Sequence, residues 1–508
     1  MGRKKTASKN AEAAPQFTRR SVLKWAGLAL TGATMHAHVE EPVTSFPRET
    51  ISLPCSSVMN ELSTYMSEAL NRPLPEEVTE KTKHHVVDTL AAMISGSQLL
   101  PGERALQFVR IYPGVGDSTV VASQIVGGPI ECAMANGVLA HADETDDSHS
   151  PSQSHPGCAV VPAALAAGEQ FRVSGTHFLR SVALGYDVGT RVTISLGGQR
   201  FESESHWSTH SIAPLFGAAA AASCAAGLNP QQTRWMLGYT AQQSSGLGAW
   251  NRDIQHIQKA FLFGGMSARS GVTSALLVHA GWTGVDDIFS GKDNFFAAYN
   301  PHADPSGLID KLGERYEILR TNIKKWPVGS PIQAALDALE EIRGQRLFDA
   351  GMVREVTVRL ATDEAAIVDN REIPDICVQH MLAVALVDKT IAFSTAHDRE
   401  RMKDPSVLRE RAKIKLIPDA ELERLMPLRV AILEVILLDG TKLSRRVDNV
   451  RGTPANPMTR EEVLAKARDL IVPVLGAQKC AALLDKLIAV ERVSDLRELR
   501  PLLQTAGS

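Results

Sequence analysis

The sequence concentrates carboxylates and imidazoles in one short segment, residues 141–155. Four Asp or Glu side chains and three His side chains fall within these fifteen positions: His141, Asp143, Glu144, Asp146, Asp147, His149 and His155. Carboxylates that crowd around imidazoles shift one another's pKa values, and acid/base pairs arise in this way. The segment therefore predicts a site that moves protons.

Two other interpretations of this segment stay open. It is also compatible with a solvated acidic loop, in which His141 caps a helix or lies in the core. Oxygen ligands together with His could also bind Mg²⁺ or Zn²⁺. The sequence holds no fixed metal-binding pattern such as HExxH, so we expect no metal here.

A helix is predicted on each side of the polar segment, at residues 133–140 and 159–167, because both stretches are apolar. Pro151 and Pro156 lie between them and interrupt any helix. The polar residues are therefore expected on a loop that two helices hold in place.

The chain as a whole is predicted to be mainly α, with a smaller α+β part. Apolar residues recur at helical spacing from about residue 55 to 320. From about residue 350 they alternate instead, and the apolar run 430–438 meets the hairpin turn Asp439-Gly440. After Pro457, the capping-box pattern that begins at Thr459 predicts a helical tail.

Composition narrows the class of protein. The 508 residues need at least two domains, and the formal net charge of -3 gives no basic excess for binding nucleic acid. The six cysteines form no CxxC pair, so a zinc or thioredoxin motif has no support.

The N-terminus carries an export pattern. A polar, basic start leads to Arg19-Arg20 and Lys24, and a mildly apolar stretch follows. This order is typical of a twin-arginine signal, and the apolar stretch is too short for a membrane span. Residues 1–40 are thus expected to be a signal and linker that the twin-arginine translocase recognises, giving a periplasmic protein. If they are only a disordered basic tail, the protein stays in the cytoplasm.

Several ordered motifs resemble one enzyme family. The run NGVLAHADETDDSH…HPG at residues 136–157 resembles the signature of the 2-methylcitrate dehydratase / cis-aconitate decarboxylase (MmgE/PrpD) family. Five further segments resemble that family in the same order: residues 83–96, 206–211, 259–265, 324–328 and 451–457. Together they extend the resemblance from about residue 55 to 500.

The resemblance implies a fold and a reaction class. It implies a large all-helical domain, built from residues 45–321 and 452–508, capped by a smaller α+β lid domain at residues 322–451. It also implies a homodimer, a cleft between the domains and no cofactor. Members of the family act on small polycarboxylates by dehydration, decarboxylation or epimerisation.

The resemblance also implies roles for single residues. His155 matches a catalytic His, Asp146 and Asp147 match a pair of Asp, Glu144 replaces an Asp, and Lys259 matches an active-site Lys. Residues expected to bind the substrate are Ser148, His149, His210, Lys324, Lys325, Gln379 and His380. The chain departs from the family where Val328-Gly329 replaces a lid His and Met381 replaces a Tyr.

The sequence therefore favours a lyase, a dehydratase or decarboxylase that removes a proton next to a carboxylate of a small polycarboxylate. One alternative is an epimerase or isomerase that reprotonates the same carbanion. Another is a carboxylate-binding protein without activity. The fate of the substrate separates the three, because only a lyase releases water or CO2.

Overall fold

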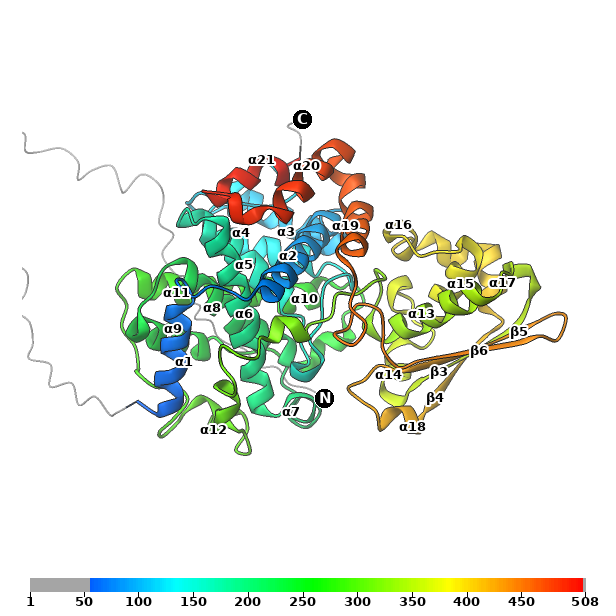
Figure 1. The fold of residues 1–508 in the computed structure, drawn as a ribbon, viewed down its shortest axis with the longest axis horizontal. Coiled ribbons are helices and arrows are strands. Elements are labelled where there is room, and N and C mark those ends of the chain that lie inside the picture. Colours follow the sequence, from blue (N-terminus) through cyan, green and yellow to red (C-terminus); the bar gives the residue numbers. More distant parts are fainter. Residues whose placement is uncertain (1–54, 506–508) are drawn as a thin grey trace, which may run out of the picture. The chain divides into compact units, whose positions relative to one another are not determined.

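A computed structural model describes residues 55–505 of the chain (Figure 1). The proposed twin-arginine signal around Arg19-Arg20 lies outside these residues and stays a prediction.

The fold is mainly α, with a large helical domain and a smaller α+β lid, as the sequence predicted. The first stretch of the helical domain contains α1 (Ser57–Glu68), α2 (Glu76–Gly96), α3 (Leu100–Ile111), β1 (Ser118–Thr119), β2 (Val126–Gly127), α4 (Pro129–Ala140), α5 (Gly157–Gln170), α6 (Gly175–Leu196), α7 (Gly198–Ser205), α8 (Thr209–Ala225), α9 (Pro230–Gln242), α10 (Ile257–Ala260), a π-helical segment (Phe261–Met266), α11 (Ser267–His279) and α12 (Phe295–Tyr299). The C-terminal stretch adds α19 (Arg460–Leu475), α20 (Ala477–Ile488) and α21 (Arg500–Leu503).

Helix α8 forms the centre of the helical domain. Its sequence after Phe216 is almost entirely Ala and Gly, and nearly every residue of the helix is buried. Small side chains allow close helix packing, and α8 packs against α5, α6 and α11. This packing fixes the helices that carry the polar loop.

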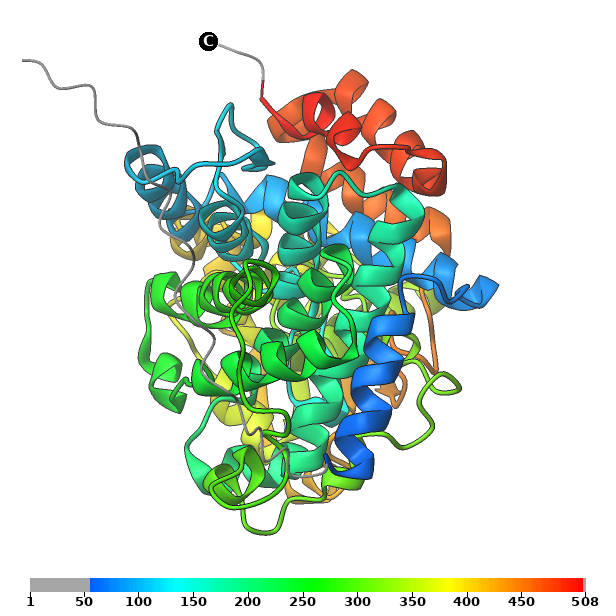
Figure 2. The same cartoon turned by 90° about the vertical axis from the view of Figure 1, so that its left-hand side faces the viewer.

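The C-terminal helices return to the helical domain. Helix α19 packs against α2, far away in the sequence, and Figures 1 and 2 show the orange and red helices beside the blue ones. The ammonium group of Lys466 lies 2.6 Å from the buried carboxylate of Asp88. Both ends of the described chain thus build one domain.

The lid is built on a four-stranded sheet with the strand order β4-β3-β5-β6. Strand β3 pairs parallel with β4 and antiparallel with β5, and β5 forms the predicted hairpin with β6. The lid elements are α13 (Ser330–Gln345), β3 (Val353–Ala361), α14 (Thr362–Val368), α15 (Val378–Asp388), α16 (Phe393–Ala396), α17 (Pro405–Arg411), β4 (Ile414–Asp419), α18 (Ala420–Glu423), β5 (Ala431–Leu437) and β6 (Lys442–Val447).

Helices α13 and α15 cover one face of this sheet (Figure 1). Alternate residues of β5 are buried, from Ala431 through Leu433 and Val435 to Leu437, as expected for a strand with one packed face. They join a hydrophobic core that is separate from the core of the helical domain.

Two chain segments connect the lid to the helical domain beside the polar loop. Asn322 forms a short antiparallel bridge with Ser148, and the amide of Ile323 donates to the carbonyl of Gly452 over 3.0 Å. Gly452 has a φ of 97°, and a Cβ there would lie 1.8 Å from the Ile323 carbonyl oxygen. The segment that leads from the lid back to the helical domain therefore needs glycine at position 452.

The apolar stretch Ile257–His279 is long and apolar enough to cross a membrane, but 67% of its most apolar window is buried in the helical domain. Core helices meet the same test of length and composition, and this burial identifies the stretch as part of the core.

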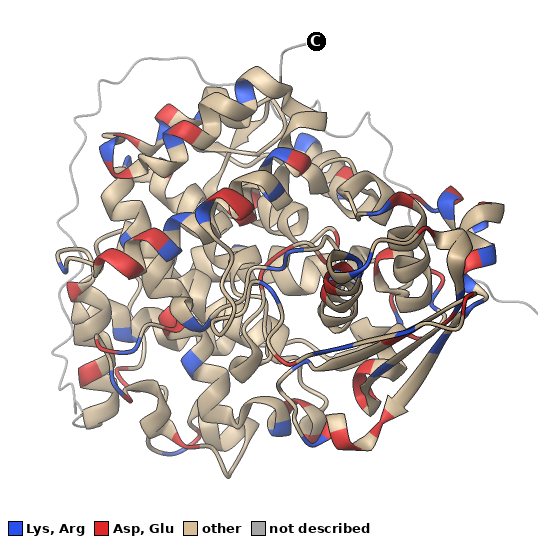
Figure 3. Cartoon of the chain, turned by 45° about the vertical axis from the view of Figure 1, so that its right-hand side comes forward, with Lys and Arg blue, Asp and Glu red and all other residues tan. Residues whose placement is uncertain are grey.

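Charged residues of both signs are interspersed along the described chain, in the helical domain and in the lid (Figure 3). Proteins that bind the phosphates of nucleic acid use clusters of Lys and Arg side chains. The mixed charges of this chain differ from such a cluster.

His380 lies in the core of the lid, on α15, rather than in a substrate site. Its side chain is fully buried, and neither ring nitrogen has a hydrogen-bond partner among the described residues. Burial, together with the nearby Arg411 and Arg401, lowers the pKa of His380 to about 4. The prediction that His380 binds substrate is therefore corrected.

This burial predicts how stability depends on pH. The folded pKa of His380 lies below its unfolded value of about 6.5, so the unfolded chain binds more protons as the pH falls from 6.5 towards 4. His380 should thus lower the free energy of unfolding by about 2 kcal/mol between pH 8 and pH 5. In His380→Leu, urea unfolding should show a fall between these pH values that is smaller by that amount. An identical fall in the variant and the wild type would contradict the prediction.

Candidate active site

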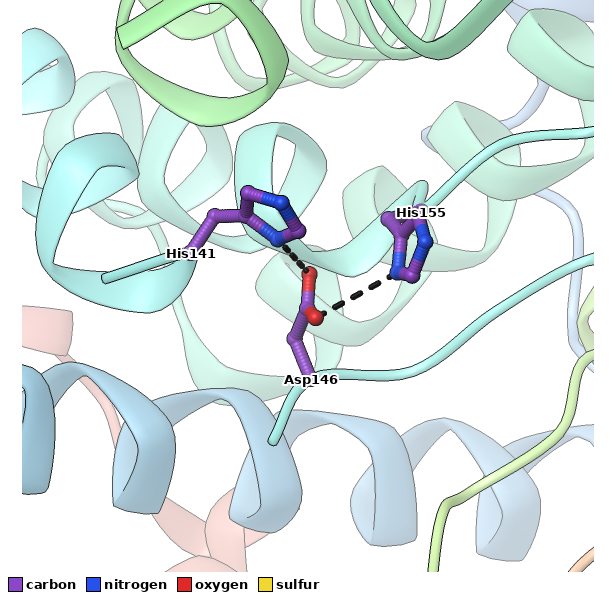
Figure 4. Close-up of side chains that lie close together, drawn as sticks. All are labelled: His141, Asp146 and His155. Atoms are coloured by element: carbon purple, nitrogen blue, oxygen red, sulfur yellow. Dashed lines mark hydrogen bonds and ion pairs between the residues drawn. The ribbon is translucent and has the colours of Figure 1, made fainter. Parts of the chain in front are cut away.

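The polar loop that follows α4 is buried, so it is not a solvated acidic loop. Asp143, Glu144, Asp146 and Asp147 are all at most 5% exposed. At the centre of the loop, the Asp146 carboxylate lies between two imidazoles (Figure 4). Its Oδ2 is 2.8 Å from Nδ1 of His141, and its Oδ1 is 3.3 Å from Nδ1 of His155.

The two flanking helices position this group as predicted. His141 is the residue that ends α4, and His155 directly precedes Pro156, where α5 begins. Asp146 lies between them on the loop. A carboxylate bound to Nδ1 fixes the orientation of an imidazole and leaves Nε2 for chemistry. His141 has such a hydrogen bond to Asp146. The buried Nδ1 of His155 faces the same carboxylate at 3.3 Å without a hydrogen bond to it, and the His155 ring borders a cleft.

Charges around the loop set its protonation states. Burial alone would raise the pKa of Asp146, but the imidazoles of His141 and His155 beside it lower this pKa well below its ordinary value. Burial lowers the pKa of His155, and Asp146 offsets only part of that effect. At neutral pH, His155 is therefore a neutral imidazole beside an ionised carboxylate, which suits a general base.

Two lysines bring positive charge to the same place. Lys259 forms an ion pair with Glu144, and Lys324 donates a hydrogen bond of 2.8 Å to the Glu144 carbonyl. The Lys324 ammonium also lies 3.7 Å from Oδ1 of Asp146. Although burial alone would raise the pKa of Glu144, the two lysines keep this pKa well below its usual range.

The π-helical segment places Lys259 and an aromatic platform beside the loop. Phe263 stacks on His141 and on His210, each with ring centroids 4.5 Å apart. Gly264 lies so close to α4 that a Cβ would be 2.0 Å from the carbonyl oxygen of Gly137. π-Helical turns are frequent at functional sites. This one directly follows the Lys259 segment and packs against α4.

These groups border a cleft of about 920 Å³ between the helical domain and the lid. Glu144, His155, His210 and Lys259 line it from the helical domain. The lid contributes Gly329 at the position where the family pattern has a His, so the chain offers no imidazole there.

Asp147 differs from Asp146 in its surroundings, although the sequence suggested a catalytic pair. Its carboxylate accepts hydrogen bonds from the Gly157 amide (3.0 Å) and the Tyr186 hydroxyl, and lies 2.8 Å from Nδ1 of His85. These groups surround a fully buried side chain that does not border the cleft. The prediction for Asp147 is corrected: it anchors the start of α5.

Three predicted substrate-binding residues also lie elsewhere. His149 is buried against Ser152 and Glu317. Lys325 pairs with Glu340 and lies over the ring of Trp326, on another surface of the lid. Gln379 donates a 2.6 Å hydrogen bond to Asp369 within the lid. Their surroundings correct the prediction that they bind substrate in the cleft.

Two other predicted residues lie close to the loop but border a second cavity, of about 310 Å³. Lys324 and Ser148 line it together, next to the connection between the domains. Lys324 thus reaches the carboxylates of the loop from a cavity that adjoins the cleft and shares Ser330 and Arg429 with it.

Sequence reasoning missed several groups of the cleft: Glu202, Trp250, Arg252, His256, Arg371 and Arg429. They come from separate segments of both domains, and no motif marks them. His256 is the strongest example, because it starts α10 with a positive φ and lies 5.2 Å from the His141 ring. Burial, followed by the charge of Lys259, lowers its pKa to about 3.

Two groups of three residues could each hold a metal ion, because the ligand atoms within each group lie within 4.8 Å of one another. One group is His141, Asp146 and His155, and the other is His141, Glu144 and His256. The ammonium groups of Lys259 and Lys324 already neutralise the carboxylates of both groups. These cations oppose a divalent ion in the same place. Absence of a metal remains a prediction.

The fold and this site define a family. The model of the MmgE/PrpD N-terminal domain matches residues 60–307, and that of the MmgE/PrpD C-terminal domain matches residues 326–489. The chain therefore belongs to the MmgE/PrpD family, which confirms the prediction from its motifs.

Relatives give a more specific comparison. The chain is 29% identical to cis-aconitate decarboxylase-like protein oryM of Aspergillus oryzae, over 58% of this chain and 63% of that protein. It is 23% identical to cis-aconitate decarboxylase of Aspergillus terreus, over 88% and 96% of the two chains, and 25% identical to that of Homo sapiens, over 85% and 91%. These names support an enzyme of the lyase class.

Proposed function

We propose that this protein is a decarboxylase that removes CO2 from a small unsaturated polycarboxylate, of which cis-aconitate is the model. The observation that carries the proposal is the oriented pair of Asp146 and His155 at the cleft, with Lys259 beside it. The names of the relatives support the same reaction. Homodimer formation, export and the periplasmic location stay predictions.

The charges of the cleft support a carboxylate substrate. Loss of CO2 leaves an electron pair that a neighbouring carboxylate of the substrate can delocalise as an enolate. Lys259 lines the cleft and can bind a substrate carboxylate. Lys324 adds a second positive charge close to Asp146. Such preorganised cations stabilise developing negative charge.

His155 is the group that moves a proton at the substrate carbon. Its lowered pKa leaves the imidazole neutral at neutral pH. Because Nδ1 faces the Asp146 carboxylate, the one ring proton is favoured on Nδ1, and Nε2 can accept a proton. A neutral imidazole can take a proton from a carbon next to a carboxylate and return it.

A substrate screen tests the proposal. The purified protein is incubated with cis-aconitate and with other di- and tricarboxylates, and the products are identified by NMR. We expect a product with one carboxylate fewer. Gain or loss of water alone would indicate a dehydratase, inversion of a carbon centre an epimerase, and binding without change a carboxylate-binding protein. Each of these three outcomes would contradict a decarboxylase.

A further inference from the structure

Decarboxylation consumes a proton, and His155 cannot be its net source. One C–C bond breaks, CO2 leaves, and the electron pair that stays on the substrate forms one new C–H bond. Any proton that His155 removes from the substrate it returns, so the additional proton has to come from a second group. That group must be protonated near neutral pH and open to solvent for reloading.

The other side chains beside the reacting centre do not fit this role. Burial lowers the pKa values of His210 and His256, so both imidazoles are neutral at pH 7. Lys259 is ion-paired with Glu144, whose own pKa lies well below its usual range. Glu144 is therefore ionised and has no proton to give, and Lys259 is needed as the cation that binds the substrate carboxylate.

Glu202 lines the same cleft from the middle of α7. Its Oε1 lies 3.4 Å from Nε2 of His210, and the His210 ring lies 5.3 Å from the ring of His155. His210 is fixed by stacking on Phe263, with an interplanar angle of 3°. The carboxyl of Glu202 is thus held on the side of the cleft where His155 acts.

We propose that Glu202 is the proton donor of the decarboxylation, a role that rests on the proposed function. Its proton enters the new C–H bond as CO2 leaves, and the resulting carboxylate takes a proton from water. The side chain is 24% exposed, which leaves a path for this reloading.

Electrostatics supports this role. Burial raises the pKa of Glu202 to about 7, against the opposing effects of the Thr209 hydroxyl and the Arg429 guanidinium of the lid. The imidazole of His210, which also faces Glu202, is neutral and adds no positive charge. About half of the Glu202 side chains should therefore carry the transferable proton at pH 7. His155 as the base and Glu202 as the acid resemble other catalytic pairs whose different environments push their pKa values apart.

Three variants test the donor. Glu202→Gln should lower kcat by about 100-fold or more with KM changed by less than about threefold, because acid catalysis contributes roughly 10²–10⁴-fold. Glu202→Asp should restore part of the activity. Glu204→Gln, which changes an exposed carboxylate on the same helix, should behave as the wild type. A normal kcat in Glu202→Gln, or a rise in KM alone, would overturn the proposal.

A measurement without substrate separates this proposal from the proposed function. Buried carboxyls such as Asp88 and Asp375, whose pKa values are raised to about 6, also give a C=O band. The infrared difference spectrum between the wild type and Glu202→Gln should therefore show one further C=O band of a protonated carboxyl, which disappears around pH 7 and is also present in Glu204→Gln. Absence of this band from the wild type would overturn the donor even if CO2 is released. If the band is present but no polycarboxylate turns over, the proposed function fails instead, and with it the donor role that rests on it.

Discussion

Replacing His155 by Gln is expected to lower kcat by at least about 100-fold while the fold stays intact, because general acid/base groups contribute about 10²–10⁴-fold. His155 is only 7% exposed, but it borders the cleft and its Nδ1 lies 3.3 Å from the Asp146 carboxylate. Gln keeps a polar side chain of similar reach but cannot take up a proton. The measurement is steady-state turnover of the carboxylate found in the substrate screen.

Two other histidines serve as controls for this variant. His302→Gln changes an exposed side chain of the helical domain and should leave kcat unchanged. His380→Gln changes the buried histidine of the lid, which lies outside the cleft, and should affect stability more than turnover. If His380→Gln is inactive and His155→Gln turns over normally, the base belongs to the lid and our assignment is wrong.

The neighbouring carboxylates Asp146 and Asp147 are expected to differ when each is replaced by Asn. Asp146→Asn should lower kcat by about 100-fold or more, because an amide no longer holds His141 and His155 as a carboxylate does. It should also shift the acid limb of the pH profile to lower pH, since Asp146 raises the pKa of His155. Asp146 thus acts through His155 as a positioning residue.

Asp147→Asn should chiefly cost stability. Its carboxylate accepts hydrogen bonds from the Gly157 amide and the Tyr186 hydroxyl and contacts the His85 imidazole. The amide of Asn has one acceptor oxygen fewer and can satisfy fewer of these partners. We expect a loss of about 2–3 kcal/mol in the free energy of unfolding, with kcat of the folded enzyme changed less than tenfold. Urea unfolding and turnover are measured on both variants. Equal losses of kcat in the two would show that the pair acts as one catalytic unit.

Much of the fold could be predicted from the sequence because local patterns determine it. The Ala-rich run after Phe216 favours a closely packed helix, and Asp439-Gly440 between two apolar stretches favours a hairpin. The parallel pairing of β3 with β4 had no such local signal, because some fifty residues separate the two strands.

The site could be predicted in part. Segment 141–155 is easy to recognise because its charged residues lie close together in the sequence. The residues that contact them lie far away in the sequence and cannot be recognised in this way. Asp147 and Asp146 are equivalent in a linear pattern, and only the packing of α2 and α6 gives His85 and Tyr186 to one of them. Glu202 and His256 carry no motif, because two separate elements, α7 and the start of α10, bring them to the cleft.

The most direct test of the account is the release of labelled CO2 from carboxyl-¹³C cis-aconitate by the wild type and by His155→Gln. The wild type should release one ¹³CO2 for each product molecule, and the variant should release it at least about 100-fold more slowly. No ¹³CO2 from the wild type, or equal rates from the two proteins, would contradict it.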